Sequence, residues 1–415
     1  MIDTNLVLNN KAYVKQQLEK KGFDIEYIDA LKKLLLEIRK QKSALDEQNR
    51  LRKAANRDDS ISPEEKRKLR RQITNSKKDF KALEAFTKSL LCDIPNLPDP
   101  DAPEGADKSG NVVIYESADY YICKTKKPLP HWDIAENLDI ADTNAASMVS
   151  GSGFYMYKGK GAKLLRALIS YAHNLHEDKY TEIIVPHLVK SDSLRYTGHL
   201  PGFSTELYKS DKDDLWLIPT AEVPLTAAYA NSVFSYESMP RRCMGYSLAF
   251  RRESGTSGSD TRGLQRIHEF HKVELLKIVQ PENVEAELMD LLDDCLKIIK
   301  ALKLQYRVVD LCTGDMGDKY ARCYDVEVFS PGVGKWLEVA SVGHFSDYQA
   351  RRAQIKYVNN RGKKCLAYTM NGSGIATPRV WLSILETYQQ PDGCVKVPDV
   401  LTPFMGCEFI QSMER

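Results

Sequence analysis

Two stretches near the N-terminus carry apolar side chains at alternating spacings of three and four residues. In residues 24–57 these side chains are Ile28, Leu31, Leu35, Ile38 and Leu45, and after Pro63 the pattern resumes at Leu69, Ile73, Phe80, Leu83 and Leu90. This spacing places each set on one seam of a helix. Pro63 follows a polar turn and is typical of a helix's first turn. We therefore expect the two helices to fold back as an antiparallel coiled-coil arm of roughly 50 Å that projects into solvent.

Positive charge is concentrated on this arm, although the formal net charge of the whole chain is only +2. Basic residues gathered on one protruding element predict a polyanionic partner that is attracted through its phosphates. An ordinary solvated coiled-coil face is the alternative. The candidate contact residues are Arg39, Lys40, Arg50, Arg52, Lys53, Arg67, Arg70, Arg71, Lys77 and Lys78.

The overall composition is typical of a soluble globular protein. Of the 415 residues, 42% are hydrophobic and 28% are charged, and this length suits about two or three domains. No apolar run approaches the roughly 20 residues of a membrane span. The N-terminus has an early acid, Asp3, and no basic start before an apolar block, so it is unlike a signal peptide. We expect a cytoplasmic protein, and mitochondrial import with loss of a transit segment stays open.

A proline-rich stretch divides the chain into two expected domains, residues 1–103 and 104–415. Prolines at 95, 98, 100 and 103 cannot continue a helix, so this stretch is expected to be a linker. Beyond it, helical and strand patterns mix, which favours an α+β domain around an antiparallel sheet. The expected helices are 161–177 and 283–302, and the expected strands are 180–185, 306–310, 324–329 and 336–340.

A hairpin is expected where two strand-like blocks, 246–251 and 266–276, flank a loop rich in Gly, Ser, Thr and Asp. Arginines supply fixed guanidinium groups for phosphate or carboxylate oxygens, Phe270 offers a flat face for a purine, and acids can accept from amino groups. An exposed hairpin whose charges pair only with one another is the alternative. The arginines are Arg251, Arg262 and Arg266, and the acids are Glu253 and Glu274.

Several familiar motifs are absent from the sequence. There is no Gly-x-x-x-x-Gly-Lys-Ser/Thr, and Gly372-Ser-Gly374 lacks the third glycine of a dinucleotide fold. His268 and His271 are three residues apart in a strand-like block, whereas a metalloprotease needs a spacing of four on a helix. The 9 cysteines form no Cys-x-x-Cys pair, so neither zinc nor a disulfide framework is expected.

The Phe250-Arg-Arg-Glu253 start and the Arg266-x-x-x-Phe270 return resemble motif 2 of the class II aminoacyl-tRNA synthetases, and those of the seryl-tRNA synthetases above all. Further segments that match in order cover nearly the whole chain. They are Thr220-Ala-Glu222, Asp260-Thr-Arg-Gly263, Val273-Glu274, Leu311-Cys-Thr-Gly-Asp-Met316, Asp347-Tyr-Gln-Ala-Arg-Arg352, and Met370-Asn-Gly-Ser-Gly-Ile-Ala376 leading to Arg379.

The resemblance implies ATP-dependent activation of serine and its transfer to the 3′ end of tRNA(Ser), with a selenocysteine tRNA as a second candidate. It implies Arg251, Arg266 and Arg379 as catalytic residues and Mg²⁺ at Glu338 and Ser341. It implies ATP contacts from Arg251, Arg252, Glu253, Arg266, Ile267, Phe270, Glu338, Val339, Ala340, Ser341 and Arg379. The implied serine-binding residues are Thr220, Ala221, Glu222, Arg251, Glu274 and Ser373.

The resemblance also implies a homodimer through motif 1, matched by residues 164–176 and 180–186, and tRNA contact through the arm. Two rival functions use the same fold: a ligase that loads a carrier protein, and a non-catalytic paralogue that serves as an interaction protein. One segment departs from the family, which usually continues Ile-Ser-Ser-Cys-Ser-Asn after the acid, whereas Glu338 is followed here by Val-Ala-Ser-Val-Gly-His344. This departure leaves two possibilities for His344, contact with the substrate or a change of packing.

Overall fold

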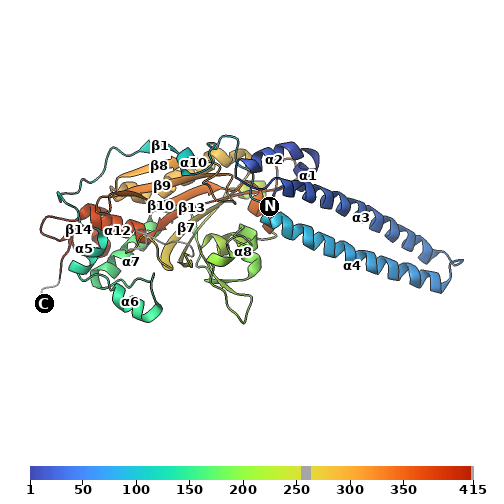
Figure 1. Ribbon diagram of the computed structural model, residues 1–415, viewed down its shortest axis with the longest axis horizontal. Helices are drawn as coiled ribbons and strands as arrows, with labels where there is room; N and C mark the ends of the chain where they lie inside the picture. The colour runs from blue at the N-terminus through green and yellow to red at the C-terminus, as the bar shows by residue number, and fades with distance from the viewer. Residues whose placement is uncertain (254–262, 413–415) are drawn as a thin grey trace. The chain divides into compact units, whose positions relative to one another are not determined.

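The computed structural model describes residues 1–253 and 263–412 (Figure 1). The chain divides into two compact units, Met1–Pro98 and Asp99–Arg415. Among the described helices, none combines the length and the apolar character that crossing a membrane requires.

The first unit is built from α1 (Thr4–Asn9), α2 (Lys11–Glu19), α3 (Glu26–Arg57) and α4 (Pro63–Asp93). Helices α3 and α4 run antiparallel, as Figure 1 shows, so the predicted coiled-coil arm is confirmed. The turn between them ends in a capping box, in which the Ser62 hydroxyl accepts from the Glu65 amide and the Glu65 carboxylate accepts from the Ser62 amide. Pro63 follows at the first helical position, where its missing N–H costs no hydrogen bond.

Apolar side chains of the predicted seam are buried most deeply at the base of the arm. There Ile28, Leu31 and Leu35 of α3 pack with Leu91 of α4 and Leu18 of α2 in one core. Toward the tip the seam is narrower, and Ala55 and Ile73 are its buried residues. Arg70 donates to the Asn56 side chain at 3.5 Å, which fixes the register of the two helices near the tip.

The second unit is organised around an eight-stranded sheet with the order β1-β8-β9-β10-β13-β7-β6-β2. Neighbouring strands pair antiparallel, except that β2 pairs parallel with β6. This confirms the predicted α+β architecture. The strands are β1 (Val112–Glu116), β2 (Thr181–Glu182), β6 (Arg241–Phe250), β7 (Glu269–Val279), β8 (Tyr306–Asp310), β9 (Arg322–Ser330), β10 (Lys335–His344) and β13 (Tyr368–Ala376).

Residues of β7 alternate between the two faces of this sheet, as the two-residue period of a strand requires. Val273 and Leu275 enter the large apolar core together with side chains of α7 (Gly159–Asn174), α10 (Val284–Ala301) and α12 (Thr377–Tyr388). Lys272 and Glu274, which alternate with them along the strand, face the other way and bond to Thr220. One face of the sheet is therefore packed against helices, and the other carries polar groups.

Shorter elements border the polar face and the ends of the sheet. The helices are α5 (His131–Asn137), α6 (Thr143–Ser150), α8 (Ser191–Thr197), α9 (Glu222–Ala227), α11 (Tyr348–Ala353) and α13 (Thr402–Met405). The paired short strands are β3 (Leu188–Val189) with β4 (Trp216–Leu217), β5 (Val233–Phe234) with β11 (Lys356–Val358) and β12 (Lys364–Leu366), and β14 (Val395–Lys396) with β15 (Phe409–Ile410).

Two local predictions differ from the structure. The strand expected at 180–185 shrinks to the two residues of β2, and Tyr180, just before β2, is buried and donates its hydroxyl to Asp294 of α10 at 2.6 Å. The expected linker is partly ordered, because Thr313 donates its amide to Pro103 and Gly314 donates its amide to Gly105. Residues 99–111 therefore belong to the second unit.

Candidate active site

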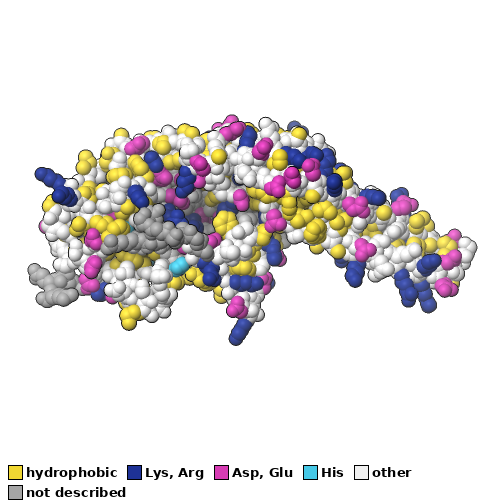
Figure 2. Space-filling view, in the orientation of Figure 1, with side chains coloured by type: hydrophobic (Ala, Val, Ile, Leu, Met, Phe, Trp, Pro, Cys, Tyr) yellow, Lys and Arg dark blue, Asp and Glu magenta, His cyan; other side chains and the backbone are white. Residues whose placement is uncertain are grey.

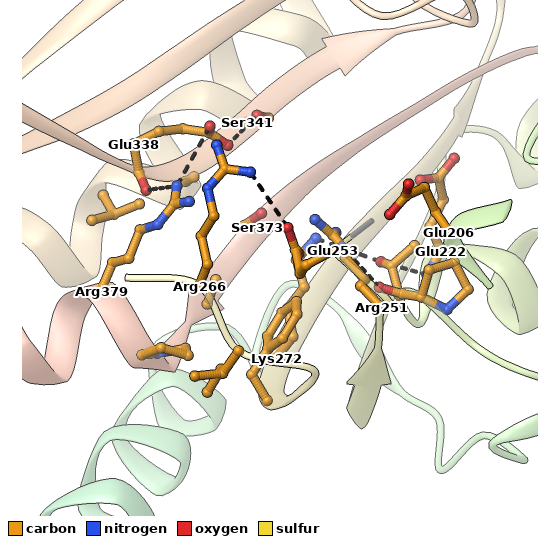
Figure 3. A pocket seen from close by; sticks show the side chains of 18 of the residues that line it. Glu206, Glu222, Arg251, Glu253, Arg266, Lys272, Glu338, Ser341, Ser373 and Arg379 are labelled. Atoms are coloured by element: carbon orange, nitrogen blue, oxygen red, sulfur yellow. Dashed lines mark hydrogen bonds and ion pairs between the residues drawn. The ribbon is translucent and has the colours of Figure 1, made fainter. Parts of the chain in front are cut away.

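A cavity of about 440 Å³ opens over the polar face of β7, β10 and β13 (Figure 3). Side chains from the β6–β7 hairpin, from α12 and from the loops before α9 and β9 complete its walls. Most of the residues that the sequence predicted line it: Thr220, Glu222, Arg251, Glu253, Arg266, Ile267, Phe270, Glu338, Val339, Ala340, Ser341, Ser373 and Arg379.

The open end of the hairpin holds Arg251 against Phe270. The Arg251 amide donates to the His268 carbonyl at 2.9 Å, so the two chains stay paired just beyond the strands. The Arg251 guanidinium lies 5.2 Å from the centre of the Phe270 ring, and its Nε donates to the Pro219 carbonyl at 3.4 Å. A stacked and hydrogen-bonded guanidinium keeps one orientation, which suits recognition of a phosphate.

Glu253 and Arg266 meet across the same hairpin. Their closest atoms, Glu253 Oε2 and Arg266 Nη1, are 3.4 Å apart. Glu253 has a backbone φ of 49°, a left-handed conformation that is uncommon for a residue other than glycine. The turn at Glu253 thus brings a carboxylate to face the guanidinium of the returning chain.

Arg379, in the first turn of α12, is fixed from two sides. Its Nη1 donates to the Glu338 carbonyl at 2.7 Å and lies 3.5 Å from the Glu338 carboxylate. Its Nε donates to the Gln265 carbonyl at 3.2 Å. Helix α12, strand β10 and the returning hairpin chain therefore converge on one guanidinium. Figure 3 shows the pairing of Arg379 with Glu338.

Two carboxyl groups and a hydroxyl lie together beside Arg379. The Ser341 hydroxyl is 2.7 Å from an Asp325 oxygen and 3.1 Å from a Glu338 oxygen. Burial, and then the charge of Glu338, raise the pKa of the Asp325 carboxyl well above its ordinary value. Burial also acts to raise the pKa of Glu338, but the charge of Arg379 and the Ser341 hydrogen bond lower it by more, so the net shift is downward.

This oxygen cluster fits a hard divalent cation that is completed by a ligand. Mg²⁺ is usually bound by one or two carboxylates together with water and substrate phosphates. Within residues 1–253 and 263–412, no group of three or more His, Cys, Asp or Glu side chains could hold a metal ion. Glu338 and Ser341 would therefore share such an ion with phosphate oxygens.

The other end of the cavity is small and densely hydrogen-bonded. The Thr220 hydroxyl and the Lys272 ammonium both donate to Glu274 Oε2 at 2.5 Å, and the Asn371 amide donates to Glu274 Oε1 at 2.6 Å. Glu274 is completely buried, and it lies behind Thr220 and Asn371 instead of lining the cavity. Buried polar groups in this density are suited to a small polar ligand, because an apolar ligand would leave them unpaired.

The departure from the family pattern after Glu338 changes the packing at this end. A Cβ on Gly343 would lie 2.6 Å from the Tyr320 ring, so glycine is what admits that ring. Tyr320 lines the cavity and packs on Phe345 with ring centres 4.9 Å apart. His344 does not line the cavity; it is buried, with Nε2 3.4 Å from Asp99. Of the two possibilities for His344, the structure favours the change of packing.

Three predicted residues lie beside the cavity without lining it, namely Arg252, Ala221 and Glu274. Arg252 turns to the Tyr208 ring, 5.4 Å from its centre. Arg262 lies outside the described residues. Lys272 and Asn371 were not among the predicted residues, although the two-residue period of their strands places them beside Phe270, Glu274 and Ser373. Nor were His199, Lys319 and Tyr320, which lie in loops without a motif of their own.

Comparison with known proteins agrees with this geometry. Residues 203–388 match the model of the tRNA synthetase class II core domain (G, H, P, S and T). A serine–tRNA ligase of Dehalococcoides mccartyi is 39% identical over 418 residues, which cover 99% of this chain and 100% of that protein. A serine–tRNA ligase of Gloeothece citriformis is 45% identical over 350 residues, 84% of this chain and 81% of that protein.

Among solved structures, the seryl-tRNA synthetase from Pyrococcus horikoshii complexed with ATP superposes with a TM-score of 0.91 at 31% identity, and the match covers 100% of both chains. The similarity therefore includes the arm as well as the sheet. Full-length identity at this level, together with the shared fold, confirms the predicted family. The chain belongs to the seryl-tRNA synthetase family of the class II aminoacyl-tRNA synthetases.

Proposed function

We propose that this chain activates L-serine with ATP and transfers the seryl group to the 3′-terminal ribose of tRNA(Ser). The observation that supports it is a single cavity with fixed guanidinium groups at one end and a small, densely hydrogen-bonded polar end opposite. In the first step the serine carboxylate attacks the α-phosphorus of ATP and diphosphate leaves, which gives seryl-adenylate. In the second step a ribose hydroxyl of the tRNA attacks the seryl carbonyl and AMP leaves.

The phosphates of ATP are assigned to the three arginines of the cavity. Arg251 contacts the α-phosphate, while Arg266 and Arg379 hold the outer phosphates. Glu253 accepts from the adenine amino group, Phe270 stacks on the ring, and the remaining ATP contacts come from Arg252, Ile267, Val339 and Ala340. Each arginine is already fixed by protein contacts, so the site stabilises developing phosphate charge with little reorganisation.

Mg²⁺ is assigned to Glu338 and Ser341, where the neighbouring Asp325 adds a second carboxyl group. The ion, when bound with ATP, would neutralise phosphate charge and help to align the outer phosphates.

Serine is assigned to the small polar end of the cavity, with contacts from Thr220, Ala221, Glu222, Arg251, Glu274 and Ser373. Asn371 Oδ1, beside Glu274, is buried without a hydrogen-bond partner among the described residues, so an analogue without the hydroxyl would leave this acceptor unpaired.

The arm is assigned to the body of the tRNA. Figure 2 shows Lys and Arg side chains toward the tip of the α3–α4 hairpin. The candidate contact residues are distributed along both helices, and Arg39, which donates to the Asn5 side chain at 2.9 Å, lies near the base. The binding should follow shape and phosphate more than base edges. A homodimer through α7, β2 and the residues that follow β2 completes the proposal.

The test is ATP–diphosphate exchange with serine, glycine, alanine and threonine in turn. Serine alone should support exchange, and Arg251→Ala should lower its rate at least a hundredfold, since it removes the guanidinium that faces the α-phosphate. A matched control is Arg195→Ala, because Arg195 is half-exposed, pairs with Asp192 and does not line the cavity. Absence of serine-dependent exchange in the unchanged protein would contradict the proposal.

A further inference from the structure

Lys319 occupies an unusual position for a lysine, at the polar end of the cavity. It comes from the segment between β8 and β9, and its side chain is 13% exposed. Its Nζ lies 2.5 Å from Glu222 Oε2, and the Glu222 side chain is 1% exposed. A cation and a carboxylate are thus buried together where the proposed function places the amino acid.

Three separate elements hold the Glu222 carboxylate. Oε1 accepts from Gln349 of α11 at 2.7 Å, and Oε2 accepts from Lys319 and also from Asn371 of β13 at 3.3 Å. Lys319 alone among these donors carries a charge. Removing that charge would leave a buried carboxylate facing two neutral amides, which is costly in a nearly dry site.

His199 contributes a neutral ring on the other side of Lys319. The Thr197 hydroxyl donates to the Leu194 carbonyl at 3.2 Å and therefore accepts from His199 Nδ1 at 2.8 Å. The proton of a neutral ring then lies on Nδ1, and Nε2 accepts from Lys319 at 3.4 Å. Burial, and then the charges of Lys319 and Arg251, hold the pKa of His199 well below its ordinary value, in agreement with a neutral ring.

Two aromatic rings also lie close to the Lys319 ammonium. Lys319 Nζ lies 5.4 Å from the centre of the Tyr320 ring and 5.2 Å from that of Phe345. Tyr320 is in turn held on Gly343, the glycine of the departing segment. Lys319 and Tyr320 both line the cavity, so they form part of its wall at this end.

We propose that Lys319 is a positioning and specificity-determining residue for the amino acid. It neutralises and orients Glu222, and with Tyr320 it closes the cavity behind the amino acid so that only a short polar side chain fits. This inference rests on the proposed function and deepens it, because it assigns the size limit of the amino-acid site to a residue outside the family motifs quoted above.

The variants Lys319→Met and Lys319→Gln both remove the charge of Lys319 while keeping most of its length, and only glutamine keeps a donor; both are measured in the amino-acid-dependent exchange assay. We expect the KM for serine to rise at least tenfold and the KM for ATP to stay within twofold, with the smaller rise in Lys319→Gln because glutamine still donates to Glu222. Lys319→Ala, which also opens the wall, should raise kcat/KM for threonine relative to serine at least tenfold. The matched control is Lys297→Met, which removes a lysine paired at 2.7 Å with a 1%-exposed carboxylate outside the cavity.

A residue that serves only the fold would lower the melting temperature and change both KM values together, and that result would overturn the inference. A serine KM within twofold in folded Lys319→Met or Lys319→Gln would overturn it as well. The assay is run with all twenty amino acids. If the unchanged protein supports exchange with another amino acid instead of serine, only the serine assignment is rejected. The role of Lys319 is then tested by the effect of its variants on the KM for that amino acid. No exchange with any of the twenty amino acids rejects both.

Discussion

At the scale of single residues, His176 shows how burial without a partner makes folding depend on pH. It lies just after α7 and is 1% exposed, and neither ring nitrogen has a hydrogen-bond partner among the described residues. Burial lowers its pKa to about 4, although the charge of Asp294 opposes the shift. Because the folded pKa lies below the ordinary 6.5, stability from this group is present above pH 6.5 and is lost as the pH falls toward 4.

We expect His176→Leu to make the free energy of unfolding less dependent on pH in this window. Between pH 6.5 and about 4 the His176 side chain is protonated in the unfolded chain and neutral in the folded chain. The free energy of unfolding therefore falls by about 1.4 kcal/mol for each unit by which the pH decreases. The variant lacks this pH-dependent term, so its free energy of unfolding at pH 5 should equal or exceed that of the original protein. Urea unfolding at pH 7.5, 6 and 5 measures it, and parallel curves for the two proteins would contradict the assignment.

Motifs predicted most of the residues that line the cavity, but they could not predict Lys319 and Tyr320 at its polar end. Arg251, Glu338 and Arg379 belong to segments that resemble the family, so their position along the chain is informative by itself. Lys319 has no such signal, because its role depends on a contact with Glu222, 97 positions away in the sequence. Gly343 likewise has no signal of its own in the sequence, because its effect on packing depends on the approach of the Tyr320 ring in the folded structure.

At the scale of elements, the sequence predicts best where a periodic pattern extends over many residues. The seam repeats over several turns in both α3 and α4, and Pro63 marks the start of α4, so the predicted and observed helices agree closely. The strand expected at 180–185 is observed only at the two residues of β2, because a run of six residues carries little periodicity and predicts strand ends poorly.

The arm should be separable from the chemistry. Arg70 lies opposite Asn56, so residues 40 and 86 lie at about the same height in the antiparallel pair. Replacing residues 40–86 by a short Gly-Ser turn should therefore preserve the base of the arm around Leu35 and Leu91. We expect the rate of serine-dependent exchange to stay within twofold and kcat/KM for tRNA charging to fall at least a hundredfold. Unchanged charging would show that the arm does not hold the tRNA.

Charge substitutions on the arm give a finer measurement at the same scale. Replacing Arg67, Arg70 and Arg71 by Gln should weaken tRNA binding and reduce the slope of log affinity against log salt by about two to three, since each phosphate contact contributes about 0.7–0.9 to that slope. A slope that stays the same would mean that these residues contact no phosphate, whatever the loss of affinity.

At the scale of the whole molecule, the structure leaves apolar side chains exposed near one edge of the sheet. Ile184, which follows the edge strand β2, is 91% exposed. Exposed large apolar side chains of this kind mark interaction surfaces when they gather. Because β2 pairs with β6, and β6 ends immediately before Arg251, a partner that covers this edge would also steady the arginine of the cavity.

We therefore expect Ile184→Asp to convert the proposed homodimer into a monomer and to lower serine-dependent exchange at least tenfold. The physical reason is that a charge buried in an apolar interface has no counter-ion, while the fold of a single chain loses nothing at a 91%-exposed position. Analytical ultracentrifugation measures the first effect and the exchange assay the second.

Ile122→Asp, at an isoleucine that is 76% exposed on a different segment, is the matched control and should stay dimeric. A dimer that survives Ile184→Asp would place the interface elsewhere, and a monomer with full activity would show that Arg251 needs no support from a partner.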